Sequence, residues 1–296
     1  MGKNMKTKEN TKSKLIRFGE RCVKIFCIFL VILGAGLCFS GQTVYAATGY
    51  NDTEPNNSYE DAQLISRNAQ TATQYVSGQS TVYRYVMGTL SYDDEDWYKV
   101  YLYSNSETYL DFNVGTGTIF VELYDSSNPN VPVDRYEFQK YGDTNVYEIP
   151  VVSDGLYYLR VYHSTIGISS TYNFTIGNPK YEFGNYTYKF NQTTLAAKST
   201  WEDTEDLTRI AEIPDRAIGY EIVIGGCSIS VSSERYFYNE SYDSWVATNI
   251  THSYKLPVTD ASLLDQEWGA KIVSTSSSSH TFTPTMTIRY VAPKLP

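Results

Sequence analysis

Four consecutive acidic residues are the feature of this sequence best suited to binding a metal ion. The segment Asp93-Asp94-Glu95-Asp96 places four carboxylates next to one another. Like charges at such short range repel unless water or a cation neutralises them. Calcium takes six to eight hard oxygen ligands, which carboxylates, amide oxygens and backbone carbonyls supply. The segment therefore indicates either a calcium site or a solvated acidic turn in which Asp96 bonds to backbone amides.

Residues that could act as a nucleophile or a general base are few. The three histidines, His163, His252 and His280, do not have the spacing of a zinc site. Cys227 could form a dyad with His252 or His280, but it follows an apolar strand pattern with no predicted helix start to lower its pKa. No Gly-x-Ser-x-Gly motif occurs. We therefore expect a protein without catalytic activity, with a hydrolase in the C-terminal half as the less favoured alternative.

One predicted strand, Leu156–Tyr162, could present a ligand-binding face. Side chains alternate between the two faces of a strand, and the more apolar alternate residues should face the core. The face predicted to be exposed carries Tyr158, Arg160 and Tyr162. Tyrosine and arginine are frequent anchors of binding surfaces. The alternative is ordinary cross-strand packing of tyrosines, which are abundant throughout this sequence.

The N-terminal segment predicts export. Residues 1–24 carry eight Lys or Arg against Glu9 and Glu20, and an apolar run from Ile25 to Phe39 follows. This order is typical of a signal peptide, which we place at residues 1–46 with cleavage after Ala46. An uncleaved membrane anchor is the alternative, but the apolar run is short for a bilayer span. The long basic region is typical of Gram-positive exporters, and we expect a secreted, extracellular chain without membrane attachment after cleavage.

Cleavage would change the charge and the cysteine content. Residues 1–46 contain eight of the 24 basic and two of the 33 acidic residues, so 16 basic and 31 acidic residues remain, a formal charge of −15. Such a surface repels nucleic acid and anionic membranes. Only one of the four cysteines, Cys227, lies outside the leader, so no internal disulfide can form. A bound calcium ion could supply some of the missing stability.

Alternating apolar and polar residues, typical of strands, dominate the remaining sequence. The strands predicted in the first half are Val82–Leu90, Trp97–Tyr103, Tyr109–Val114, Ile119–Tyr124, Asp134–Phe138, Val146–Val152, Leu156–Tyr162 and Tyr172–Ile176. Those predicted in the second half are Tyr186–Phe190, Leu207–Ile213, Tyr220–Val231, Trp245–Ile250, Trp268–Ser274 and Thr281–Val291. A short helix is expected over Ser58–Ser66, with Ala62, Leu64 and Ile65 facing inward. These patterns predict an all-β protein: a jelly-roll-like β-sandwich over residues 50–177 and a second β-sandwich-like domain over residues 180–296.

A series of motifs in the first half resembles a known family. The motifs, in order, are Asp52-Thr53-Glu54-Pro55-Asn56-Asn57-Ser58, Asp61-Ala62, Gly88-Thr89-Leu90, Asp93, Asp96-Trp97-Tyr98, Leu123-Tyr124-Asp125 and Gly155-Leu156-Tyr157-Tyr158-Leu159-Arg160-Val161. Their order, spacing and residue types resemble the bacterial pre-peptidase C-terminal domain, which is related to the collagen-binding domain of clostridial collagenases. The resemblance covers residues 50–177, and nothing after about residue 180 takes part in it.

The resemblance implies a jelly-roll-like accessory module of secreted hydrolases that has no catalytic centre. No peptidase accompanies the module in this chain. In the collagen-binding relatives, calcium joins the acidic N-terminal segment to a later Asp-rich loop. The residues at the matching positions are Asp52, Glu54, Asn56, Asn57, Asp93 and Asp96, with Asn57 contributing a backbone carbonyl.

Together these patterns predict a secreted, non-catalytic binding or adhesion module that calcium stabilises and that recognises an extracellular protein or glycan. An accessory subunit of a separately encoded secreted hydrolase is the alternative, and that hydrolase would then be its partner.

Overall fold

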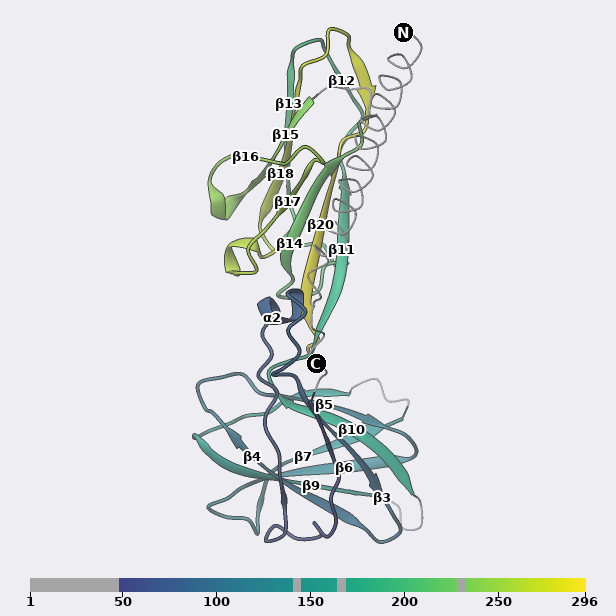
Figure 1. The fold of residues 1–296 in the computed structure, drawn as a ribbon, viewed down its shortest axis with the longest axis vertical. Helices are drawn as coiled ribbons and strands as arrows, with labels where there is room; N and C mark the ends of the chain where they lie inside the picture. The colour runs from purple at the N-terminus through teal and green to yellow at the C-terminus, as the bar shows by residue number, and fades with distance from the viewer. Residues whose placement is uncertain (1–47, 141–144, 164–168, 228–232) are drawn as a thin grey trace, which may run out of the picture. The chain divides into compact units, whose positions relative to one another are not determined.

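The computed structural model describes residues 48–140, 145–163, 169–227 and 233–296. Its regular elements are almost all strands, which confirms the predicted all-β fold (Figure 1). The signal peptide predicted at residues 1–46 lies outside the described residues. Within the described part of the chain, no helix is both long and apolar enough to cross a membrane.

Strands before Asn178 form two five-stranded sheets. The elements are β1 (Thr48–Asn51), β2 (Gln63–Leu64), α2 (Ala72–Val76), β3 (Arg84–Leu90), β4 (Glu95–Leu102), β5 (Tyr109–Val114), β6 (Thr118–Asp125), β7 (Pro132–Gln139), β8 (Val146–Glu148), β9 (Gly155–His163) and β10 (Ser170–Gly177). One sheet has the order β1-β3-β10-β5-β8 and is called the β3 sheet below; the other has the order β2-β4-β9-β6-β7 and is called the β4 sheet. Strands are present at all eight places predicted in this half.

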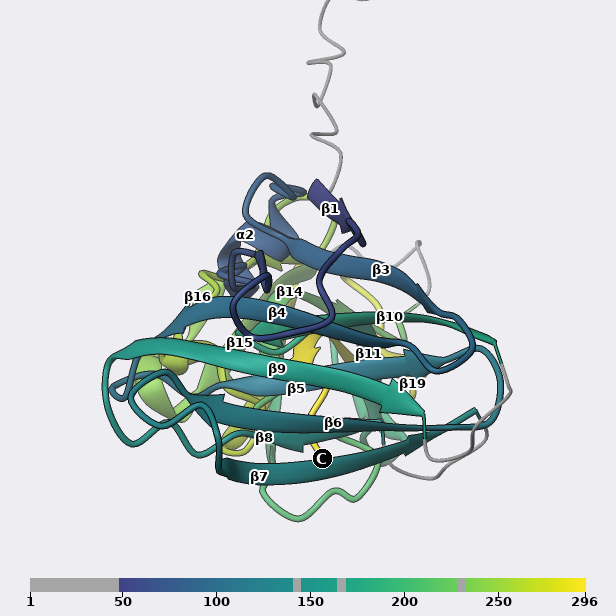
Figure 2. The same ribbon diagram turned by 90° about the horizontal axis from the view of Figure 1, so that it is seen from below.

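The two sheets pack face to face around one apolar core (Figure 2). The core follows strand alternation: Tyr98, Val100 and Leu102 of β4 are fully buried, whereas Tyr101 between them is exposed. Phe112 of β5 stacks on Phe138 of β7 with ring centroids 4.8 Å apart. Each buried side chain of this size stabilises the fold by about 1.5–3 kcal/mol before entropy is counted. Burial of this kind holds the sandwich together without a disulfide.

The helix predicted over Ser58–Ser66 is wrong. The segment forms a turn, and Gln63–Leu64 pairs in parallel with Tyr98 and Lys99 of β4. Ala62 is buried as expected, but Leu64 is 63% exposed. Hydrogen bonds to a neighbouring strand outweigh the weak helical preference of so short a segment. The helix of this half lies later, at Ala72–Val76, where Thr71 and Gln74 form a capping box.

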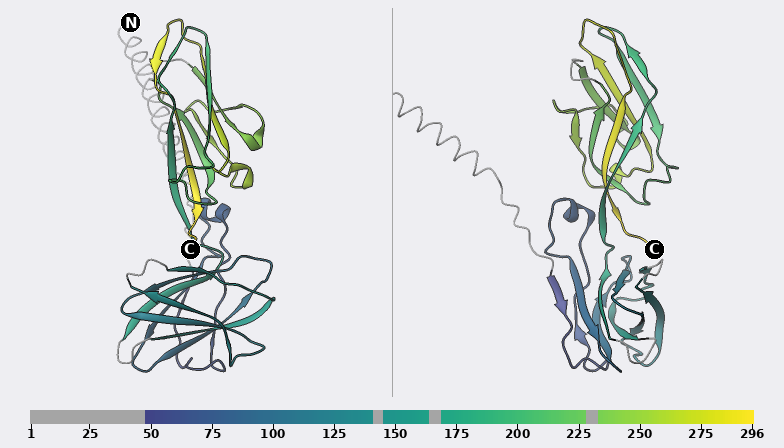
Figure 3. Two further views of the ribbon diagram at one scale, coloured as in Figure 1. Left: turned by 180° about the vertical axis from the view of Figure 1, so that it is seen from behind. Right: turned by 90° about the vertical axis from the view of Figure 1, so that its right-hand side faces the viewer.

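Strands after Pro179 form separate sheets with their own core. The elements are β11 (Tyr181–Lys189), β12 (Thr193–Leu195), β13 (Thr200–Asp206), β14 (Ile218–Gly225), β15 (Ser233–Asn239), η1 (Glu240–Tyr242), β16 (Val246–Ala247), β17 (Ser253–Lys255), η2 (Asp260–Ser262), β18 (Glu267–Ser274), β19 (His280–Phe282) and β20 (Thr285–Pro293). The sheet orders are β11-β20-β14-β17, β13-β18-β15-β16 and β12-β19. β11 and β20 pair along their whole lengths (Figure 3). Trp268, Phe237 and Ile288 are fully buried in the core of this half.

Strand prediction was less accurate in this half. Leu207–Ile213 forms consecutive turns, in which Ile210 bonds to Leu207 and Ile213 bonds to Ile210. No strand is predicted for the segment next to it, Thr200–Asp206, because its residues are mostly polar and charged. It is an edge strand, and edge strands carry charges that discourage pairing with other chains. The predicted strand Trp245–Ile250 shortens to β16, and β14 ends at Gly225, before the end predicted at Val231.

Candidate metal centre

Three carboxylates meet at one end of the first sandwich. One oxygen from each of Asp52, Glu54 and Asp96 lies within 4.8 Å of the others. Asp52 and Glu54 follow β1 of the β3 sheet, and Asp96 belongs to β4 of the β4 sheet. The cluster therefore joins the two layers of the sandwich.

Asp96 points inward because of its position in β4. It shares the inward face with Tyr98 and Val100, so strand alternation carries its carboxylate into the interior, where it has no exposed surface. There Asp96 Oδ2 is hydrogen-bonded to the hydroxyl of Tyr172, which comes from β10 of the opposite sheet. The alternative in which Asp96 bonds only to backbone amides does not include this contact between the sheets.

The segment from Asp52 to Asn56 is held to both sheets by its backbone. The amide of Asp52 donates to the carbonyl of Met87 in β3 at 2.8 Å, and the amide of Trp97 in β4 donates to the carbonyl of Asn56 at 2.8 Å. Side chains complete the attachment, because Asn56 Nδ2 donates to Asp52 Oδ1 at 2.8 Å and Tyr98 donates to the same oxygen at 2.7 Å. The position of Asp52 is therefore set by contacts to both sheets.

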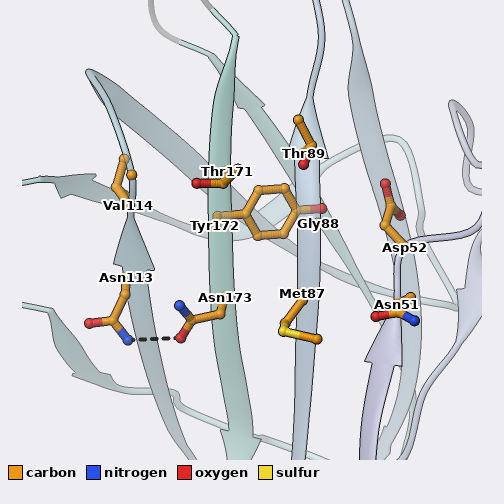
Figure 4. Close-up of a pocket in the computed structure, with 11 residues that line it drawn as sticks. Asn51, Asp52, Met87, Gly88, Thr89, Asn113, Val114, Thr171, Tyr172 and Asn173 are labelled. Atoms are coloured by element: carbon orange, nitrogen blue, oxygen red, sulfur yellow. Dashed lines mark hydrogen bonds between the residues drawn. The ribbon is translucent and has the colours of Figure 1, made fainter.

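Gly88 makes room for the tyrosine that reaches Asp96. Tyr172 pairs with Gly88 across β10 and β3, and its ring lies over the glycine with the hydroxyl on the far side (Figure 4). A Cβ atom at position 88 would lie 2.3 Å from the Tyr172 ring and hydroxyl. The absence of a side chain at Gly88 is thus what allows the ring to cross the neighbouring strand.

The hydrogen bonds of this cluster need one proton more than its two tyrosines supply when no cation is present. Three contacts run in series from Asp96 to Tyr172, from Tyr172 to Tyr98 and from Tyr98 to Asp52. Two hydroxyls supply two protons, so the third belongs to one of the two carboxyl groups at the ends, Asp96 or Asp52. Burial and then the negative charges of Asp52 and other nearby carboxylates raise the pKa of Asp96 to about 8, which favours Asp96 as the protonated group.

Several features of the cluster suit a cation. Among the described residues, none of the three carboxylates takes part in an ion pair. Burial and the charges of Asp94 and Asp52 also raise the pKa of Glu54. Two buried oxygens, Asn56 Oδ1 and Asp96 Oδ1, have no hydrogen-bond partner in the described part of the chain. Leaving a buried acceptor unpaired costs about 1–3 kcal/mol, which coordination would offset. The donor set consists only of hard oxygens, as calcium requires.

The structure brings together four of the six residues expected to form the calcium site. Asp52, Glu54, Asn56 and Asp96 converge. Asn57 lies beside them, where its amide nitrogen can donate to the carbonyl of Glu95 at 2.8 Å and to Asp94 Oδ1 at 3.0 Å.

Asp93 does not join the cluster. It is exposed in the turn before β4, with φ of 54°. The neighbouring residue Asp94 does influence the cluster, because its negative charge raises the pKa of both Asp96 and Glu54. Sequence reasoning missed Tyr98, Tyr172 and Gly88. The available signals were the recurrence of Asp96 and Tyr98 on one strand face and the presence of Gly88 and Tyr98 in the motifs that carry the family resemblance.

The proposed aromatic face makes contacts within the protein. Tyr158, Arg160 and Tyr162 do share the outward face of β9 and are half-buried. Arg160 Nε donates to Glu95 at 2.7 Å, and Tyr162 donates to Glu122 at 2.8 Å. Tyr158 packs edge-on against Tyr59, with ring centroids 6.0 Å apart. A ligand-binding role for the three residues stays a prediction.

The Cys–His dyads gain no support from the surroundings of Cys227. Burial raises the pKa of its thiol, whereas a nucleophilic cysteine needs a lowered pKa. Burial and the nearby Arg235 lower the pKa of His252, and His280 Nε2 is 3.0 Å from Ser276 Oγ. The absence of catalytic activity stays a prediction.

No protein-family model matches this sequence, and no curated protein matches it either. Among solved structures, the chain is similar to an inferred secreted protein from Eubacterium rectale, with 13% identity and a TM-score of 0.49 over 84% of this chain and 87% of that one. It is also similar to the PBSX exported protein XepA, with 10% identity and a TM-score of 0.23 over 70% and 84% of the two chains. A Sulfolobus Turreted Icosahedral Virus structure gives 11% identity and a TM-score of 0.24 over 70% and 58%. Similarities this distant assign no family, so membership of the pre-peptidase C-terminal domain family stays a prediction.

Proposed function

We propose that this chain is a secreted, non-catalytic binding or adhesion module whose first sandwich is braced by calcium. The observation that carries the proposal is the convergence of Asp52, Glu54 and Asp96 beside two buried oxygens without partners. The basic and apolar leader supports export, and the absence of an internal disulfide leaves a role for a bound ion.

Calcium would act as a clamp between the sheets. Its ligands would come from the segment after β1 and from β4, so binding would join the start of the described chain to both layers. The ion would also neutralise three carboxylates that otherwise repel one another, and it would displace the proton from Asp96. Ligand binding to the folded state alone stabilises it, by about 2.7 kcal/mol at a calcium concentration one hundred times the Kd.

Isothermal titration calorimetry of the chain after residue 46 with calcium chloride tests the clamp. We expect one site with a Kd on the order of 0.1–1 mM, as in other extracellular calcium modules. The variants Asp52→Asn and Asp96→Asn should lose the site because each removes a converging carboxylate. Absence of heat in the parent protein, or unchanged binding in both variants, would overturn the proposal of a calcium site.

The binding role needs its own test. Immobilised collagen, gelatin, peptidoglycan and neutral polysaccharides, each with calcium and with a chelator, cover the expected ligand classes. Retention on at least one of these supports a binding module. A chain that binds none of them but co-purifies stoichiometrically with a secreted hydrolase would instead be an accessory subunit.

A further inference from the structure

A hollow of about 610 Å³ lies on the outer face of the β3 sheet, next to the metal centre. It extends over β1, β3, β10 and β5 and includes Asp52 at one side. Figure 4 looks onto this hollow. Asp52, Gly88 and Tyr172 belong to the surroundings of the metal centre and also line the hollow, whereas its other lining residues take no part in the metal centre.

Amide side chains form a row across this hollow. Strand register places Asn51 beside Met87, Met87 beside Asn173, and Asn173 beside Asn113. A second row contains Thr89 and Thr171, which are also paired. Figure 4 shows the amides and the thioether side by side on four strands. Three of the four adjacent strands therefore present an amide in this row, and β3 presents the thioether of Met87.

Part of the hydrogen-bonding capacity of the row is unused within the protein. Asn113 Nδ2 donates to Asn173 Oδ1 at 3.1 Å, and Asn113 Oδ1 accepts from Asn145 at 3.3 Å. The amide nitrogen of Asn173 and the side chain of Asn51 have no partner among the described residues. A carboxamide offers both donors and an acceptor, so each free group can pair with a hydroxyl acting in either direction.

The near absence of charged side chains in the hollow favours an uncharged ligand. Charged residues make up 19% of the chain, yet the side chains in the hollow are neutral except for Asp52. The carboxylate of Asp52 is already bonded to Asn56 and Tyr98. Met87, which is 44% exposed in the middle of the row, adds an apolar contact. Amides, hydroxyls and one thioether match a neutral ligand rich in hydroxyl groups and C–H faces.

A peptide fits the hollow less well. The strands that carry most of the hollow, β3, β10 and β5, are paired on both sides, so a peptide lying across them cannot bond to their backbones. Only β1, at the margin of the hollow, is an edge strand of this sheet. We infer that this hollow binds a neutral glycan chain. The inference rests on the proposed binding function and names its ligand class.

Affinity electrophoresis of the chain after residue 46 tests the inference, with calcium present. The gels contain mannan, β-glucan, xylan or galactan, and a further gel contains gelatin as the peptide probe. We expect at least one neutral polysaccharide to retard the protein. Asn173→Asp should weaken that retardation at least tenfold, because it removes a free donor and adds a charge, while the new carboxylate can still accept from Asn113. Thr171→Val, which removes a hydroxyl but keeps the shape, should weaken it severalfold.

A matched control is Asn185→Asp, the same change at an exposed position of β11 outside the hollow. It should leave retardation unchanged, and circular dichroism should show all three variants folded. Retardation that survives both hollow variants, or no retardation by any neutral polysaccharide, overturns the inference. Retardation by gelatin alone overturns the glycan inference while leaving the proposed binding function intact.

Discussion

The hydroxyl groups of Tyr172 and Tyr98 are hydrogen-bonded in the interior of the first sandwich, and they link Asp96 to Asp52. Tyr172 belongs to one sheet and Tyr98 to the other. The contact therefore connects the metal centre to the packing of the two layers. Buried polar networks of this kind stabilise a fold only when every member is paired.

Substitution of Gly88 should disturb this network from a distance. Gly88→Ala places a Cβ 2.3 Å from the Tyr172 ring, which must then move away from Asp96. We expect a loss of about 1–3 kcal/mol in the free energy of unfolding, the usual cost of overpacking. Thermal denaturation followed by circular dichroism measures it. Gly155→Ala is the control, because a Cβ there meets nothing within 4 Å. Equal melting temperatures for the two variants would contradict the role assigned to Gly88.

Stability without calcium should decrease as the pH rises. The pKa of Asp96 is about 8 in the folded protein, against an ordinary value of 3.8. Between those values the folded state holds a proton that the unfolded state has lost, so raising the pH favours unfolding. We expect a loss on the order of 3–5 kcal/mol between pH 4 and pH 8, measured by urea denaturation in a chelator. Asp96→Asn should flatten this dependence. A profile unchanged by Asp96→Asn would show that other groups cause it.

Calcium binding near pH 7 should release a proton. Because the metal-free cluster holds a proton on Asp96, coordination of that carboxylate must displace it. Titration calorimetry in PIPES, imidazole and Tris buffers measures the effect, since the observed heat then varies with the buffer's ionisation enthalpy. We expect close to one proton per calcium at pH 7 and much less at pH 9. Heats that do not depend on the buffer would contradict the protonated state of Asp96.

The two neighbouring aspartates of the turn should differ in their effect on calcium affinity. Asp94 acts electrostatically on Asp96 and Glu54, whereas Asp93 is exposed and outside the cluster. Asp94→Asn should weaken binding about fivefold, which corresponds to about 1 kcal/mol for a charge near the site. Asp93→Asn should change it less than twofold. A larger effect from Asp93→Asn would restore the ligand set expected from the sequence.

Removal of calcium should also weaken any ligand bound in the hollow. Asp52 lines one side of the hollow and belongs to the metal centre. Loss of the ion should therefore make the position of Asp52 in the hollow less well defined. We expect a two- to tenfold loss of glycan affinity in a chelator, measured by affinity electrophoresis. In Asp96→Asn, where calcium does not bind, the chelator should have no further effect. A chelator effect that persists in this variant would show that calcium acts elsewhere.

The accuracy of prediction depended on how local the signals were. Strand alternation in β9 concerns neighbours in the sequence, and that strand was found with the correct inward face. β13 was missed because an edge strand needs few apolar residues. The strand predicted over Leu207–Ile213 is wrong because consecutive turns can also bury apolar residues that are three positions apart.

The sequence by itself determined the all-β class, the place of every strand predicted before Asn178, and the three acidic residues that converge. The class and the strand positions follow from side-chain periodicity and composition, which need no knowledge of the partner strands, whereas the acidic residues were expected from the family resemblance. Only the tertiary structure decided that Asp96 faces Tyr172, that Asp93 lies outside the cluster, and that Asn51, Asn173 and Asn113 form one row. Those relationships depend on strand order and register between segments far apart in the chain, where a shift of one residue would turn each side chain to the other face.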